Sequence, residues 1–158
     1  MNTDDIVLRP ITPEDESFLF AVYASTRADE MKLVPWSETE QEEFLRMQFA
    51  AQHKHYQSEY PDADYQIILQ DDQSIGRLYV DRGAAEIRIL DVTLLPEYRN
   101  RGIGGPLVEA LIAEGNNTSK AVVIYVDNFS GAASLFERLG FSKAENNGIN
   151  SLFVHHPV

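Results

Sequence analysis

The sequence predicts one domain of mixed α/β (α+β) class, in which helices pack against a central sheet. Apolar residues switch repeatedly along the chain between helical spacing and short strand-like runs. No repeat, low-complexity tract or long linker divides the chain. The length of 158 residues and the hydrophobic content of 44% suffice for one buried core. We therefore expect a single domain over residues 1–158.

One strand and two helices are expected in the first part of the chain. Residues 6–11 read as a strand. A helix over residues 12–27 begins with a threonine cap, a proline at its first position and acidic residues in its first turn. The Ser-Glu-Thr-Glu sequence at residues 37–40 is a capping box. It opens a second helix that we expect to end near residue 55.

The second part of the chain predicts strands that alternate with two further helices. Apolar runs at 65–69 and 75–80 flank a polar turn, which indicates a hairpin. At the end of the last helix, Gly140 can adopt the left-handed conformation while Phe141 folds back onto Phe136. The remaining elements are expected at 86–95 (strand), 104–114 (helix), 121–126 (strand), 130–139 (helix) and around a hairpin turn at 146–148.

The strand at residues 86–95 changes its apolar parity part-way along. Ile87 and Ile89 share one face, whereas the apolar residues that follow lie at even positions. Because side chains alternate strictly along a strand, this switch indicates a β-bulge near residues 90–91. A strand buried on both faces would give a similar pattern, so both interpretations are open.

Composition excludes several classes of function. The chain has no cysteine, so it can form neither a disulfide framework nor a thiolate site. The net charge of −12 disfavours nucleic acid and anionic membranes as partners and favours cationic ones. No apolar run approaches the roughly 20 residues of a membrane span, and the acidic N-terminus does not resemble a signal peptide. We expect a cytoplasmic protein.

Arginine and glycine gather between the strand at residues 86–95 and the helix that follows it. Unpaired N–H groups at a helix start attract anions, and glycines let an anion approach the backbone. We therefore expect an anion site here, and a strand-to-helix turn with solvated arginines is the alternative interpretation. The segment comprises Arg99, Asn100, Arg101, Gly102, Ile103, Gly104 and Gly105.

Common nucleotide and metal motifs do not fit this segment or any other. A dinucleotide motif would need a third glycine where Leu107 stands, and no Gly-Lys-Ser/Thr ending of a P-loop is present. The sequence contains no His-Glu-x-x-His pattern and no Gly-x-Ser-x-Gly elbow. We expect no metal site.

Two motifs resemble those of the GNAT N-acetyltransferase superfamily. Arg99-x-x-Gly102-x-Gly104, preceded by Leu-Leu-Pro-Glu-Tyr, is similar to the family's coenzyme A motif. Residues 128–141, from Asn128 to Leu-Gly-Phe, are similar to its second motif. The resemblance implies a mixed sheet of about six to seven strands, flanked by about four helices, with splayed central strands.

The resemblance also implies a set of binding residues for acetyl-CoA as cosubstrate. The backbone amides of residues 101–105 would bind the pyrophosphate, with Arg99 and Asn100 beside them. The pantetheine arm would lie along the strand from Val92 to Leu94, as an added strand does. Asn128 fits the asparagine of the second motif. The amide of Leu94 would stabilise the oxyanion of the transition state.

The general base is not fixed by the motif. The position where the family often carries glutamate is Arg88 here. Glu86 could act through water, or it could be a solvated charge at the strand end. Asp91 could act as the base, or it could stabilise the bulge.

The family's frequent general acid, a tyrosine, is replaced by Phe136. Phe136 cannot protonate a thiolate, and its packing on Phe141 is a sufficient structural role. Ser134 and Tyr125 are nearby polar substitutes. Coenzyme A thiolate is a fairly good leaving group, so water could supply the proton.

The sequence therefore predicts an acetyl-CoA-dependent N-acetyltransferase that acts on a primary amine of a small molecule or peptide. The alternatives are a GNAT-like module that binds acyl-CoA without turnover, and a transferase for longer acyl groups or hydroxyl acceptors. Acceptor specificity is expected from residues 27–36, and Tyr56 and Tyr60 could line the acceptor cleft or cover the sheet. By family habit the chain could form a homodimer, which no feature of the sequence itself indicates.

Overall fold

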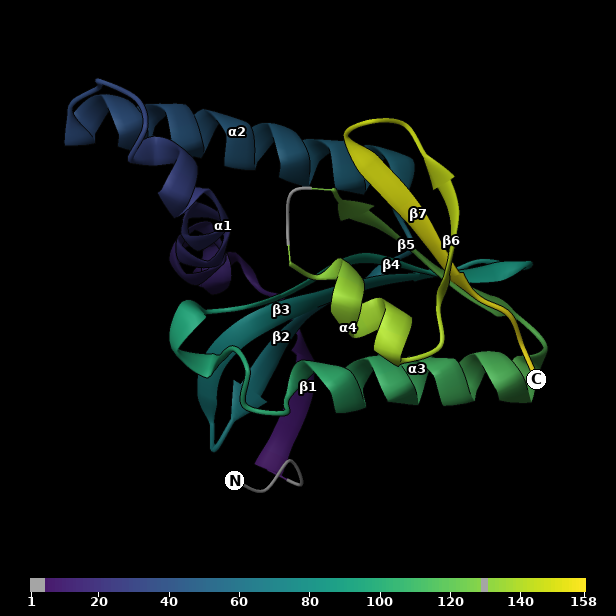
Figure 1. Ribbon diagram of the computed structural model, residues 1–158. Coiled ribbons are helices and arrows are strands. Elements are labelled where there is room, and N and C mark those ends of the chain that lie inside the picture. Colours follow the sequence, from purple (N-terminus) through teal and green to yellow (C-terminus); the bar gives the residue numbers. More distant parts are fainter. Residues whose placement is uncertain (1–4, 129–130) are drawn as a thin grey trace.

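A mixed sheet runs through the middle of the molecule (Figure 1). The computed structural model describes residues 5–128 and 131–158. In these residues the strands are β1 Ile6–Pro10, β2 Asp64–Gln70, β3 Gln73–Arg82, β4 Glu86–Leu94, β5 Ala121–Asp127, β6 Ser142–Asn146 and β7 Asn150–His155. Their order in the sheet is β1-β2-β3-β4-β5-β7-β6. Only β4 and β5 pair in parallel among these neighbours, so the predicted mixed class is confirmed.

Helices cover both faces of the sheet (Figure 1). The helix pair α1 and α2 packs on one face, and α3 and α4 pack on the other. None of the helices within the described residues is long and apolar enough to cross a membrane. Their bounds are α1 Glu16–Met31, α2 Glu38–Glu59, α3 Gly104–Thr118 and α4 Ala133–Arg138, with single 3₁₀ turns at Pro13–Asp15 and Pro96–Tyr98.

Several predicted helix ends were wrong, although each element and its order were right. α1 and α2 each run about one turn beyond the predicted end, because no glycine or proline interrupts those turns. α3 also runs one turn further and passes through Gly115, where a Cβ atom would lie 2.7 Å from the carbonyl oxygen of Lys120. α4 is shorter than predicted, since Gly131 and Ala132 form a turn before it. The predicted start of that helix at residue 130 lies outside the described residues.

The end of α4 has the predicted geometry. Gly140 is left-handed with a φ of 94°. Its amide donates to the carbonyl of Glu137 at 3.1 Å, and the amide of Phe141 donates to that of Phe136 at 3.0 Å. The rings of Phe136 and Phe141 lie 5.3 Å apart. This Schellman motif directs the chain from the helix into β6.

The parity switch in β4 is a β-bulge, as the first interpretation predicted. Tyr79 on β3 pairs with Asp91, and the next residue of β3 pairs with Ile89, so Leu90 is the extra residue. Leu90 packs with the apolar cluster of α1 and α2, and Asp91 contacts Arg77 on the same face. The bulge therefore turns two consecutive side chains toward one side of the sheet.

The parallel pairing of β4 with β5 stops next to this bulge. The register runs from Glu86 opposite Ala121 to Ile89 opposite Ile124 and goes no further. Both strands continue past this point, β4 to Leu94 and β5 to Asp127. The central strands are thus splayed, and an opening lies between their carboxyl ends.

An ion pair at the start of α1 makes stability depend on pH. Arg9 donates to both carboxylate oxygens of Asp15 at 2.8 Å. These hydrogen bonds lower the pKa of Asp15 to about 2, against the opposing effect of burial, and the amide of Thr12 adds to the lowering. The ionised form is therefore favoured in the folded state.

We predict that Asp15→Asn lowers the free energy of unfolding by about 1 to 2 kcal/mol near neutral pH, as Arg9 is partly exposed. A depressed folded-state pKa stabilises the protein above the ordinary aspartate pKa of about 3.9 and loses that effect as the pH falls toward the folded value. The gap between wild type and variant should hence narrow below about pH 4. Urea unfolding of both proteins across this pH range measures the difference between their free energies of unfolding. A difference that does not change with pH would contradict the prediction.

Candidate active site

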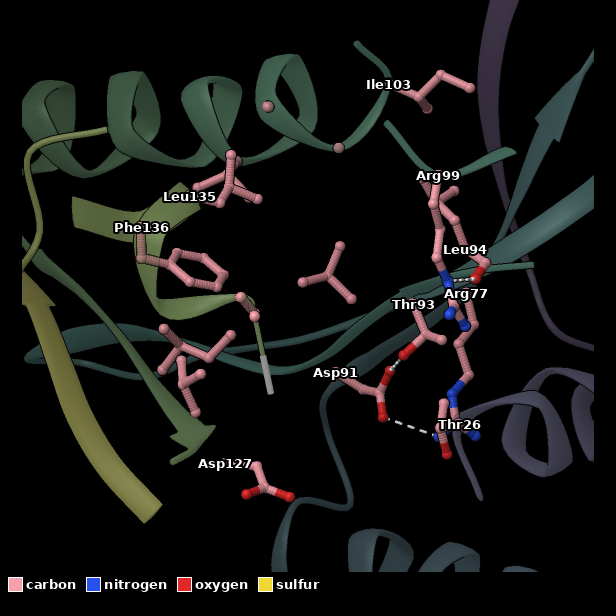
Figure 2. Close-up of a pocket in the computed structure, with 18 of the residues that line it drawn as sticks. Thr26, Arg77, Asp91, Thr93, Leu94, Arg99, Ile103, Asp127, Leu135 and Phe136 are labelled. Carbon is pink, nitrogen blue, oxygen red and sulfur yellow. Dashed lines mark hydrogen bonds and ion pairs between the residues drawn. The ribbon is translucent and has the colours of Figure 1, made fainter. Parts of the chain in front are cut away.

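An open cleft of about 890 Å³ lies where β4 and β5 separate (Figure 2). Its walls come from α1, from the carboxyl ends of β4 and β5, from the start of α3 and from α4. The glycine-rich segment closes one end of the cleft. The cleft thus combines residues from both predicted motifs, and the described part of the second motif contributes through α4 and the turn before it.

The glycine-rich segment presents uncapped backbone N–H groups to the cleft. Asn100 and Gly102 are left-handed, with φ of 60° and 74°. Ile103 occupies the N-cap of α3 and its side chain provides no capping hydrogen bond. A Cβ atom added to Gly104 or Gly105 would meet no atom within 4 Å. Alternating left-handed residues before an uncapped helix start form a concavity that suits an anion.

Guanidinium groups lie around this concavity. Arg99 donates from Nε to the carbonyl of Leu94 at 2.9 Å, which ties the segment to the end of β4. Arg101 lies outside the cleft lining, with its guanidinium 5.8 Å from the ring centre of Tyr98. Arg138, from the end of α4, lines the cleft. Among the described residues, no carboxylate forms an ion pair with any of these three arginines.

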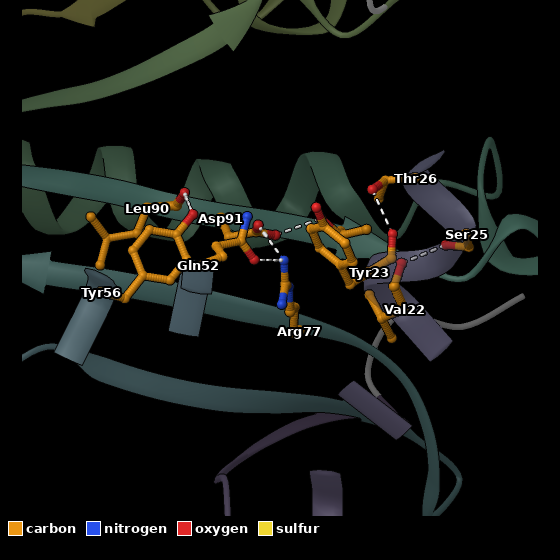
Figure 3. A network of polar contacts seen from close by, with 10 residues as sticks. Val22, Tyr23, Ser25, Thr26, Gln52, Tyr56, Arg77, Leu90 and Asp91 are labelled. Carbon is orange, nitrogen blue, oxygen red and sulfur yellow. Dashed lines mark hydrogen bonds and ion pairs between the residues drawn. The ribbon is translucent and has the colours of Figure 1, made fainter. Parts of the chain in front are cut away.

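Asp91 enters the cleft from the bulge, and a buried arginine holds it (Figures 2 and 3). Arg77 on β3 donates from Nη2 to Asp91 Oδ2 at 2.8 Å and to Gln52 Oε1 on α2 at 3.0 Å. The hydroxyl of Thr93 donates to the other oxygen of Asp91. Arg77 is 2% exposed and Asp91 14%. Burial is the strongest influence and acts to lower the pKa of Arg77, but the charge and hydrogen bond of Asp91, together with the nearby phenols of Tyr79 and Tyr56, raise the pKa overall.

Helix α2 also holds the bulge through its backbone. The hydroxyl of Tyr56 donates to the carbonyl of Leu90 at 3.1 Å (Figure 3). Burial, together with the charge of Asp91, raises the pKa of Tyr56 above its usual value, so the phenol stays protonated and able to donate. Tyr56 thus satisfies a carbonyl at the position where the bulge disrupts the ladder.

A comparison of the sequence with models of protein families finds a match. The model of the "Acetyltransferase (GNAT) domain" matches residues 61–143, more than half of the chain. The chain belongs to the GNAT acetyltransferase family. The match covers β2 to the start of β6, and so includes the bulge, the glycine-rich segment and α4.

Solved structures of acetyltransferases share the fold over nearly the whole chain. A PaiA N-acetyltransferase from Thermoplasma acidophilum in complex with coenzyme A has 21% identity and a TM-score of 0.70, over 96% of this chain and 98% of that one. An acetyltransferase from Thermus thermophilus has 18% identity and a TM-score of 0.71, over 99% of both chains. A GNAT acetyltransferase from Elizabethkingia anophelis with acetyl-CoA bound has 17% identity and a TM-score of 0.63, over 97% and 99%. No curated protein matches the sequence.

The structure brings most of the predicted binding residues of this GNAT chain together in the cleft. Two predicted residues besides Arg101 lie elsewhere among the described residues. Glu86 stands at the opposite end of β4, where pairing with β5 is intact, and it accepts from Arg88 at 2.8 Å. The predicted residues that line the cleft are Asp91, Val92, Leu94, Arg99, Asn100, Gly102, Ile103, Gly104 and Gly105.

Asn128 is the other predicted residue that lies outside the cleft. Its contacts stabilise the final hairpin. Its side chain donates to Asn146 at 2.9 Å and accepts from Ser151, and its amide donates to the carbonyl of Ile149. The asparagine of the motif thus joins the end of β5 to the turn between β6 and β7. Its side-chain groups are engaged in this hairpin.

At the family's tyrosine position, Phe136 is 2% exposed and offers no proton. It lines the cleft and packs against Phe141 and Phe153. Of the two polar substitutes, Ser134 donates to the carbonyl of Gly131 at 3.2 Å, and Tyr125 is half exposed at the cleft. The described residues contain no cluster of histidine, aspartate and glutamate that could hold a metal ion.

Three charged residues of the cleft were not among the residues predicted from the sequence. Arg77 could have been noticed as a lone cation within the apolar run of β3. Arg138 precedes Leu-Gly-Phe, and Asp127 follows the apolar run of β5. All three line the cleft.

We predict that Asp91→Asn destabilises the fold by about 3 kcal/mol, because it leaves the buried Arg77 without its carboxylate. Replacing both residues, as Arg77→Met with Asp91→Asn, should cost less than the sum of the two single changes. Urea unfolding of the wild type, the two single variants and the double variant gives the four free energies of a double-mutant cycle. Additive losses would show that the two side chains are not coupled.

Proposed function

We propose that this protein is an acetyl-CoA-dependent N-acetyltransferase with a single domain, acting on a primary amine of a small molecule or peptide by direct attack in a ternary complex. The observation that carries the proposal is the uncapped start of α3, which opens into the cleft behind left-handed Asn100 and Gly102. That geometry fits a pyrophosphate, and family membership makes coenzyme A the expected donor of one.

The splay between β4 and β5 supports the placement of the rest of the cosubstrate. Past Ile89 the backbone of β4 has no ladder to β5. An extended pantetheine arm would pair with this free edge near Val92 and Leu94. Arg99 and Arg138 would neutralise negative charge of the phosphates, since each lines the cleft without an acidic partner among the described residues.

Within this cleft, transfer requires an uncharged amine next to the thioester carbonyl. The amine nitrogen attacks the carbonyl carbon, and the backbone amide of Leu94 is our candidate donor to the developing oxyanion. The carbon–sulfur bond then breaks, its electron pair stays on sulfur, and the attacking nitrogen loses one proton to water. Because Phe136 has no proton to give, water protonates the thiolate.

The leading alternative is a non-catalytic module that binds acyl-CoA. The observation in its favour is the buried Phe136 where the family often has an acid. A thiol-release assay with acetyl-CoA and a panel of primary amines separates the two functions. Amine-dependent release supports the transferase, whereas tight binding with no release from any amine supports the module.

We predict that Gly104→Asp weakens coenzyme A binding at least about 100-fold, since it places a carboxylate in the proposed anion site; two units of log affinity correspond to about 2.7 kcal/mol. A Cβ at this position has open space around it, so the fold should persist. Titration calorimetry measures the affinity.

The matched control is Asn117→Asp, which adds the same charge to α3 at an exposed position near its other end. This variant should bind coenzyme A as the wild type does. Unchanged affinity in Gly104→Asp would rule out the placement of the pyrophosphate at the start of α3.

A further inference from the structure

A second cavity, of about 560 Å³, lies between the first half of α1 and the middle of α2. The segment that joins β1 to α1 forms its third side. Among the described residues, none that lines this cavity also lines the cleft between β4 and β5. Its volume falls within the range of small-molecule sites. The lining residues are Ile11, Thr12, Pro13, Glu16, Leu19, Arg46, Phe49, Ala50, His53 and Lys54.

One face of α2 forms a wall of the second cavity. Its five lining residues recur at helical spacing, so they share one side of the helix. Ala50 stands in the middle, four residues from Arg46 and four from Lys54. The rise of the helix places these two cationic residues about 12 Å apart along its axis. The small side chain of Ala50 therefore leaves room for a ligand between them.

The floor of the second cavity is apolar. Leu19 is 3% exposed and Phe49 is 8% exposed. The ring of Phe49 lies 5.8 Å from that of Phe20 and 5.9 Å from that of Tyr23, so the core holds it in place. An apolar group that enters the cavity would lose contact with water against this floor.

The rim of the second cavity carries more positive than negative charge, in a protein whose net charge is −12. Arg46 lies 4.1 Å from the ring centre of Phe20 and forms an exposed ion pair with Glu42 at 3.2 Å. Lys54 is exposed and forms no ion pair among the described residues. Glu16 is the one carboxylate among the described lining residues. The rim thus favours an anionic ligand.

His53 adds a hydrogen-bond donor beside Lys54. Its ring is half-buried and lies 6.5 Å from each of the rings of Phe49 and Tyr65. Within the described residues its ring nitrogens have no hydrogen-bond partner. Imidazole carries an N–H donor in its neutral and in its protonated form. His53 can therefore donate to an anion in either form.

We propose that the second cavity binds a small organic carboxylate whose apolar body has about the size of a phenyl ring. The carboxylate accepts hydrogen bonds from Lys54 Nζ and from a ring N–H of His53. The apolar body lies over Ala50 and against Phe49 and Leu19. This ligand is neither the cosubstrate nor the amine of the proposed function, and its binding does not depend on the transfer reaction.

The test is an NMR titration of the ¹⁵N-labelled wild-type protein near neutral pH. The probe is 3-phenylpropionate, and 3-phenylpropionamide and acetate are its comparisons, since each lacks one half of the proposed recognition. Saturable shifts should gather at the amides of residues 11–19 and 46–54. The carboxamide and acetate should each bind at least about 10-fold more weakly, because one has no charge and the other no apolar body.

Two variants of exposed positions on α2 test the proposed contacts. Lys54→Gln should weaken 3-phenylpropionate about 10-fold, as it removes one charge-assisted hydrogen bond. Ala50→Leu should abolish saturable binding, because it fills the space between the two cations, and leucine suits a helix. The matched control is Lys32→Gln, which removes an exposed charge at the end of α1 outside the second cavity and should bind as the wild type does.

Three results would each overturn the proposal. These are shifts that gather at residues of the cleft instead, equal affinity for the carboxylate and the carboxamide, and no saturation by about 20 mM. Unchanged affinity in both Lys54→Gln and Ala50→Leu would overturn it as well. None of these results bears on whether coenzyme A binds at the start of α3.

Discussion

One extra residue in β4 determines how the rest of the site is built. Leu90 interrupts the ladder with β3, and the parallel pairing with β5 ends beside it. The cleft lies where β4 and β5 separate next to this bulge. The bulge also turns Asp91 toward α1 and α2, so a buried arginine on β3 can hold it. Tyr56 and Arg77 stabilise an irregular backbone that the ladder alone would not support.

Charge is distributed unevenly between the surface and this cleft. The chain has a net charge of −12, yet guanidinium groups without an acidic partner among the described residues lie near the start of α3. Carboxylates of the cleft lie on β4, β5 and α1, where Arg77 pairs with Asp91 and Arg27 pairs with Glu30. Unpaired cations near the start of α3 fit a phosphate-bearing donor.

How far the sequence alone predicts the site depends on whether the signal is local. The parity switch predicted the bulge, and the glycines predicted the turn before α3, since both are recorded in consecutive residues. The position of Glu86 outside the cleft could not be predicted from consecutive residues. Only the strand register shows that Glu86 lies at the end of β4 that is paired with β5. The ion pair of Arg77 with Asp91 joins two strands, and α3 continues through Gly115 although a glycine favours a helix end. Those features depend on tertiary packing.

The central claim is that the start of α3 binds the pyrophosphate of coenzyme A, and a thermal-shift titration of the wild-type protein tests it most directly. Acetyl-CoA, coenzyme A and NAD would be compared side by side. A ligand specific for the folded state stabilises it by about 2.7 kcal/mol at about 100 times its dissociation constant. We expect both coenzyme A forms to raise the melting temperature and NAD to leave it unchanged. No shift with either coenzyme A form would contradict the account.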